Sequence, residues 1–93
     1  RYGYMVKEHL DRVAEVLGSE FAAAALEIFH PLDKRVYQGT APRVVAAALA
    51  YLAAERLGRH THMRTIAKIL NVSKYSVRDT AWRLRRYVRK EEP

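Results

Sequence analysis

The chain has 93 residues, 49% of them hydrophobic and 29% charged, with a formal net charge of +7 at pH 7. A chain of this length buries one modest core, so we expect a single domain over residues 1–93, and a composition this apolar excludes a disordered chain. Cysteine is absent, which excludes disulfides and thiolate metal sites. No apolar run is long enough to span a membrane and no signal sequence is present, so we expect an intracellular protein, in a cytoplasm or nucleoid, or in a nucleus.

Helical spacing of apolar residues predicts the first two elements. One helix runs over residues 4–17 and closes at Gly18, a residue common at helix ends. Ser19 is predicted to cap a second helix over residues 20–29. Pro31 should end that helix, because the residue before a proline is pushed away from helical angles.

The middle of the chain predicts a polar connection followed by a buried helix. Residues 32–41 form a loop that still buries something through Val36 or Tyr37. Pro42 suits the first position of a third helix, which continues until Gly58. This helix is apolar nearly all round, and such helices lie inside a protein.

The last third predicts a helix-turn-helix over residues 61–90. Thr61 and Ser73 are predicted N-caps of its two helices, and Asn71 lies where the chain must reverse. The second helix is long and should bury one face, made of Val77, Ala81, Leu84 and Val88. With no strand periodicity anywhere, the predicted fold class is all-α, with five helices.

The positive charge is concentrated in the helix-turn-helix. Residues 1–58 hold seven basic and seven acidic side chains, whereas residues 59–90 hold ten basic side chains and a single acidic one, Asp79. A basic patch this local is typical of proteins that neutralise nucleic-acid phosphates. A solvated basic helix end is the simpler alternative, since cations are favoured in a last turn.

Residues 39–51 carry the pattern G-x-x-P-R-x-V-A-A-A-x-x-Y. This pattern resembles the central helix of the cyclin-like repeats of transcription factor IIB and its archaeal counterpart, transcription factor B. The Ile66-Ala67 pair, Val72 and the Val77-Arg78 pair fall where the second repeat of that family carries its helix-turn-helix. The resemblance extends over residues 5–88 and implies a five-helix cyclin-like fold.

The resemblance also implies a function in transcription initiation. In that family the second repeat contacts promoter DNA beside the TATA element, together with the TATA-binding protein, and RNA polymerase is recruited through other parts of the factor. By position, Arg78 matches the family's base-contacting arginine, and Tyr75 stands where a small apolar base-contacting residue is usual. The implied partners are therefore double-stranded promoter DNA and the TATA-binding protein, with RNA polymerase reached through segments outside this chain.

General chemistry assigns the remaining candidate residues. Arg78 could donate two hydrogen bonds to a guanine, and Tyr75 and Ser76 join it as base-reading candidates through their hydroxyls. The candidates for phosphate contacts are Lys74, Arg85, Arg89, Arg64 and Lys68. Trp82 is expected to cover the edge of the core rather than to stack on a base.

Neither catalysis nor a cofactor is predicted. No nucleophile stands beside a histidine, and no paired carboxylates or phosphate-binding glycine loop are present. His60 and His62 form an H-x-H pair that no nearby carboxylate or cysteine completes, so both are expected to be structural. We expect a monomer, because no heptad seam calls for a dimer.

A second hypothesis is a protein-docking module without sequence-specific DNA binding. Cyclin-like folds also bind partner peptides in grooves between helices. Here the Ala-rich helix and the loop around Tyr37 would form the interface, and the basic end would meet an acidic partner.

Overall fold

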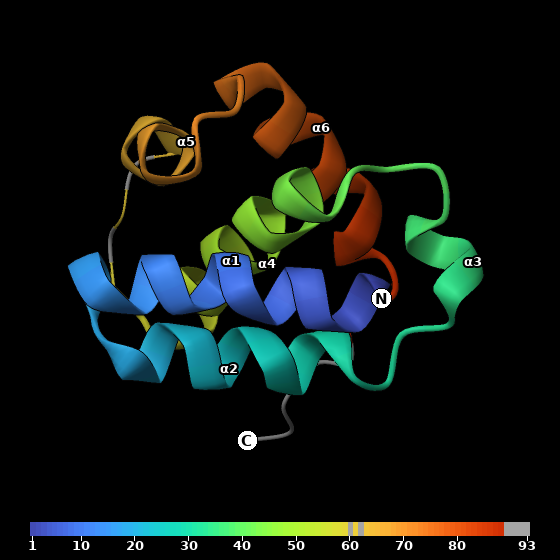
Figure 1. Ribbon diagram of the computed structural model, residues 1–93, viewed down its shortest axis with the longest axis horizontal. Coiled ribbons are helices and arrows are strands. Elements are labelled where there is room, and N and C mark those ends of the chain that lie inside the picture. The colour runs from blue at the N-terminus through green and yellow to red at the C-terminus, as the bar shows by residue number, and fades with distance from the viewer. Residues whose placement is uncertain (60, 62, 89–93) are drawn as a thin grey trace.

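In the computed structural model, which describes residues 1–59, 61 and 63–88, the chain is all-helical and no strand occurs in those residues (Figure 1). The described helices are α1 (Tyr2–Leu17), α2 (Ser19–Phe29), α3 (Lys34–Tyr37), α4 (Pro42–Arg56), α5 (Met63–Leu70) and α6 (Lys74–Arg85). α1 and α2 lie side by side and antiparallel, and α4 packs against α1, α2, α5 and α6. The predicted all-α fold class is confirmed.

The corner between α1 and α2 consists of one residue. Gly18 has a φ of 117°, a left-handed angle that a side chain would oppose, and it lets the chain reverse at once. α2 therefore begins directly at Ser19, and no side-chain hydrogen bond caps it. The prediction that Ser19 would be the N-cap was wrong, because the sharp turn leaves no residue between the two helices.

The predicted loop after α2 contains a short helix, α3, which the sequence reading did not include. Asp33 caps it, because its side chain accepts a hydrogen bond of 2.9 Å from the backbone N–H of Arg35. Tyr37 stacks on Tyr2 with ring centroids 4.8 Å apart, and both Tyr37 and Val36 pack against the core. The prediction that this connection buries Val36 or Tyr37 is confirmed.

α4 is the buried centre of the fold, as predicted. Residues 45–50 are all fully buried, and three of them are consecutive alanines, Ala46 to Ala48. Small side chains let α1, α2 and α6 approach the α4 backbone closely, so one helix can serve several neighbours. Within the described residues, no helix is both long and apolar enough to cross a membrane.

α5 and α6 form the predicted helix-turn-helix, joined by a three-residue turn. Asn71 has a φ of 56°, as expected where the chain reverses, and Ser73 caps α6 by accepting a hydrogen bond of 3.1 Å from the N–H of Tyr75. α5 begins at Met63, two residues beyond Thr61, and the cap position at residue 62 lies outside the described residues. Ile66, Leu70 and the α6 face at Val77, Ala81 and Leu84 are buried.

α6 ends at Arg85, five residues earlier than predicted. The backbone N–H groups of Tyr87 and Val88 bond to carbonyls three residues back, at 2.9 and 3.2 Å, which tightens the chain into a turn. This turn keeps Val88 against the core, as its spacing predicted. Val88 therefore keeps its predicted contact with the core, although α6 ends three residues before it.

Candidate nucleic-acid interface

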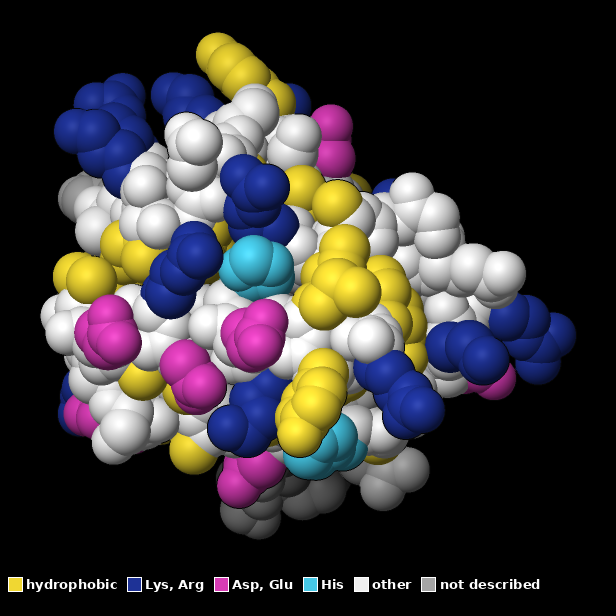
Figure 2. All heavy atoms as spheres, viewed as in Figure 1, with side chains coloured by type: hydrophobic (Ala, Val, Ile, Leu, Met, Phe, Trp, Pro, Cys, Tyr) yellow, Lys and Arg dark blue, Asp and Glu magenta, His cyan; other side chains and the backbone are white. Residues whose placement is uncertain are grey.

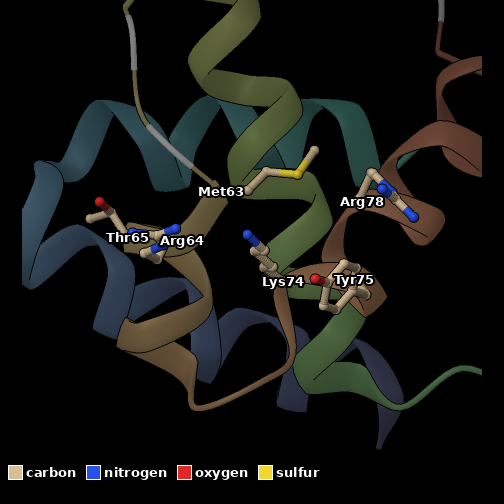
Figure 3. Close-up of a pocket in the computed structure, with 6 residues that line it drawn as sticks. All are labelled: Met63, Arg64, Thr65, Lys74, Tyr75 and Arg78. Carbon is tan, nitrogen blue, oxygen red and sulfur yellow. The ribbon is translucent and has the colours of Figure 1, made fainter.

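A hollow of about 570 Å³ opens where the first turns of α5 and α6 come together. Figure 3 shows the six described residues that line it, three from α5 and three from α6. It is lined by Met63, Arg64, Thr65, Lys74, Tyr75 and Arg78. Three of the six are cations, and the two helix N-termini add partial positive charge, so the hollow suits an anionic group.

Tyr75 projects from this hollow between two cations. Its side chain is 60% exposed, and both Nζ of Lys74 and Cζ of Arg78 lie 5.5 Å from the ring centroid. Cations over an aromatic face are attracted to it by the ring quadrupole. The three side chains therefore form one cluster, in which two positive groups lie close to an exposed ring.

Arg78 has a partner that a ligand can displace. Nε of Arg78 lies 3.6 Å from the carboxylate of Asp79, but both side chains are well exposed. An ion pair in that setting is worth only about 0 to 1 kcal/mol. A stronger bidentate partner, such as a base edge or a phosphate, can therefore displace Asp79.

The structure brings together some of the predicted site residues. Arg64, Lys74, Tyr75 and Arg78 share the hollow. Ser76 is half-buried and does not line it, since it lies about 160° round α6 from Arg78 by helical geometry.

The other predicted phosphate contacts lie outside the hollow. Lys68 is exposed one turn after Arg64 on α5, and so extends the cationic edge of that helix. Arg85 lies at the far end of α6. Arg89 falls outside the described residues.

Arg85 has two partners that the sequence did not suggest. Its Nη2 donates a hydrogen bond of 2.9 Å to Oε2 of Glu55, at the end of α4, and its Cζ lies 5.7 Å from the ring centroid of Trp82. Thirty residues separate Arg85 from Glu55 along the chain. Only the packing of α6 on α4 brings these two charges together.

Trp82 is 71% exposed, so the expectation that it covers the core edge was wrong. By helical geometry it lies opposite the buried face of α6, on the same side as Tyr75. Tyr87, just beyond α6, is also exposed. The basic segment thus presents three aromatic rings to solvent.

Two contacts on other sides of the helix-turn-helix fix it to the rest of the domain. Arg83 donates from Nη2 to Oγ1 of Thr40 at 2.6 Å, and Arg43 donates from Nη1 to the carbonyl of Asn71 at 3.5 Å. Each joins residues from distant parts of the chain, and no local sequence signal announces either. These arginines connect the helix-turn-helix to the rest of the domain, whereas Arg64, Lys74 and Arg78 line the hollow.

Charge is divided unequally over the surface (Figure 2). On this face, Lys and Arg side chains lie above α5 and also around α3, whereas most acidic side chains lie over α1 and α2. Tyr2 stacks on Tyr37, and there burial, and secondarily Tyr37, raise the pKa of the Tyr2 hydroxyl to about 12. The unequal distribution would orient a polyanion toward α5 and α6.

The described residues contain no group of three or more metal-ligating side chains. The His60 and His62 pair, predicted to be structural, lies outside the described residues. The interface is therefore built from cations, aromatic rings and helix N-termini.

Comparison with protein families gives one match. The family model described as "Transcription factor TFIIB repeat" matches residues 6–86. No curated protein and no solved structure gave a significant match to the chain. The matched range includes most of α1, all of α2 to α6 and the six residues named above as lining the hollow.

Proposed function

Because this chain belongs to the transcription factor TFIIB repeat family, we propose that it binds promoter DNA beside a TATA element, with α6 as the recognition helix. The family is one of general transcription factor domains and not of enzymes, and the chain is a cyclin-like domain of a transcription initiation factor. The observation that carries the proposal is the hollow at the start of α5 and α6, where Arg64, Lys74 and Arg78 meet.

The start of α6 is the part that would enter the major groove. Residues at the start of a recognition helix meet base edges, and arginine donates two hydrogen bonds to O6 and N7 of guanine. Arg78 is exposed and only weakly paired, so we assign it the reading of a guanine. Tyr75, exposed beside it, is the further candidate for a base contact. Ser76, the remaining base-reading candidate from the sequence, is half-buried and faces away from Arg78, so we do not assign it a base.

Phosphate contacts would surround this reading point. Lys74 and Arg64 line the same hollow, and Lys68 lies outside it, one turn after Arg64 on α5. Arg85 would contact a phosphate only after its hydrogen bond to Glu55 is broken. Arg89 is assigned to phosphate by sequence alone.

The partners follow from the family. We assign double-stranded promoter DNA as the ligand and the TATA-binding protein as the companion on the same DNA. RNA polymerase would be engaged through other segments of the factor. We expect the isolated domain to bind DNA weakly, and more tightly when the TATA-binding protein bends the site.

The alternative of a docking module finds less support. The Ala-rich helix that would form its interface is α4, and residues 45–50 of α4 are fully buried. Tyr37 is partly buried and packs against Tyr2 and Phe29. Residues 45–50 and the Tyr37 ring are therefore taken up by packing inside the domain, which leaves them little surface for a partner peptide.

Fluorescence anisotropy of labelled duplexes across a salt series tests the proposal. The parent should bind with an affinity that falls steeply with salt. Arg78→Ala should lose about 1 to 3 kcal/mol of discrimination between a preferred and a shuffled duplex. Arg12→Ala on α1 is the matched control, because it also removes one exposed arginine. If the Arg78 and Arg12 variants prefer the preferred duplex over the shuffled one to the same extent, the assignment of Arg78 is refuted. If the parent does not bind duplex even at low salt, DNA binding itself is refuted.

A further inference from the structure

Trp82 stands out as an exposed aromatic residue that the assigned roles leave without a function. It is the only tryptophan of the chain, and 71% of its side chain is exposed. Its neighbours on α6 that face inward, Val77, Ala81 and Leu84, are buried without it. The core therefore gives no reason for an indole at this position.

Trp82 and Tyr75 share the outward face of α6. Seven residues, or two helical turns, separate them, which corresponds to about 10.5 Å along the helix axis. The major groove of B-DNA is about 12 Å wide. When Tyr75 and Arg78 lie at base edges, a residue two turns later on the same face therefore comes to the wall of the groove, where the sugar and phosphate of the backbone lie.

The setting of Trp82 matches that location. Arg85 covers one face of the ring at 5.7 Å and is itself held by Glu55 at 2.9 Å. The other face and the indole N–H remain available, as the high exposure of the side chain shows. The indole N–H is a donor without acceptor capacity, and a phosphate oxygen is an acceptor.

We propose that Trp82 and Arg85 together clamp one segment of the DNA sugar-phosphate backbone, the indole N–H donating to a phosphate and the ring packing on a sugar. Once Arg85 has exchanged its hydrogen bond to Glu55 for one to the DNA, its guanidinium pairs with the same phosphate. The ligand is the phosphodiester backbone, so the clamp contributes affinity without sequence preference. This inference rests on the proposed DNA-binding function, which it extends by a second contact point on α6.

The single tryptophan makes a direct test possible. Trp82 emission, excited selectively over the tyrosines, should change as duplex DNA is added to the parent protein. In anisotropy titrations, Trp82→Phe removes the N–H and should weaken binding about threefold, and Trp82→Ala should weaken it about tenfold. Each substitution should weaken binding to the preferred duplex and to the shuffled duplex by the same factor. Tyr4→Phe, which alters an exposed aromatic residue on α1, should bind as the parent does.

Three results would overturn the clamp. Trp82 variants could bind duplex as the parent does, they could change sequence preference, or single-stranded oligothymidylate could shift Trp82 emission at lower concentration than duplex does. The second result would make Trp82 a base reader, and the third a stacking site for unpaired bases. If the parent binds duplex and Arg78→Ala flattens its preference while the Trp82 variants bind normally, the proposed function stands and the clamp alone fails. Circular dichroism of each variant verifies that α6 is folded.

Discussion

Arg85 and Glu55 join the ends of two helices that the sequence separates by thirty residues: Nη2 of Arg85 donates to Oε2 of Glu55 at 2.9 Å. Glu55 is the one acidic side chain of α4, and it lies beside the basic surface of α6. The Glu55 carboxylate is bound to the guanidinium of Arg85, which we assign to a DNA phosphate. Glu55 is therefore a competitor of the proposed ligand within the domain itself.

Glu55→Gln should raise duplex affinity about two- to fivefold at low salt, because it frees Arg85 and removes a negative charge near the DNA. The gain should shrink as salt screens the charges. Both side chains of the pair are about half exposed, so the free energy of unfolding should fall by no more than about 1 kcal/mol. Anisotropy titrations at several salt concentrations measure the effect. Glu27→Gln on α2, an exposed residue of equal charge, is the control, and an equal gain there would mean that only net charge matters.

Lys74→Ala should weaken binding to every duplex by about the same factor. Lys74 lines the hollow as an exposed cation, and loss of one phosphate contact should lower the slope of log affinity against log salt by about one. Lys7→Ala on α1 removes the same charge far from the hollow and should leave the slope unchanged. A change in sequence preference with Lys74→Ala would contradict its assignment to the backbone.

Tyr2→Phe should lower the free energy of unfolding by about 0.5 to 1.5 kcal/mol, because the Tyr2 hydroxyl donates a hydrogen bond of 2.7 Å to the carbonyl of Thr40. The ring and its stacking on Tyr37 remain in the variant. Denaturant unfolding measures the loss, and Tyr4→Phe, at an exposed position of the same helix, should cost almost nothing.

Tyr2 should also make the stability sensitive to alkaline pH. Its pKa is raised from 10.0 to about 12 in the folded protein, chiefly by burial, so the unfolded chain releases this proton first. The stabilisation by neutral Tyr2 is complete below pH 10 and is lost as the pH rises through the folded-state pKa. The difference in stability between the parent and Tyr2→Phe should therefore narrow as the pH rises above 10. If the difference in stability between the parent and Tyr2→Phe does not change with pH, Tyr2 has the same pKa in the folded and the unfolded protein.

His9 should reduce stability in mildly acidic solution. Its Nδ1 is buried without a hydrogen-bond partner, and burial, together with Arg12 and Arg43, lowers its pKa below the usual 6.5. The unfolded chain then binds a proton more readily, so stability is retained above pH 6.5 and is lost as the pH falls through the folded-state pKa. Thermal unfolding between about pH 7.5 and 5 should show a smaller loss for His9→Leu than for the parent. A parallel loss in His9→Leu and in the parent would exclude His9 as the cause.

The sequence by itself determined the elements whose signals are local. Apolar spacing located α1, α2, α4, α5 and α6, and the caps and turn at Ser73 and Asn71 followed from their own side-chain chemistry. The concentration of charge after residue 58 likewise required only counting. Helical periodicity and capping depend on residues close together in the sequence, and net charge is a sum over residues. All three can therefore be read from the sequence without knowing the fold.

Only the tertiary structure decided which of the basic side chains are bound to other parts of the domain. Arg83 is bound to Thr40 and Arg85 to Glu55, whereas Arg64, Lys74 and Arg78 line an open hollow. The exposure of Trp82 was equally invisible, because a tryptophan on a helix stripe has the same sequence signature whether or not another element covers it. Partners and burial depend on how α6 is set against α4 and the loop before it, and that placement arises from packing between segments thirty to forty residues apart.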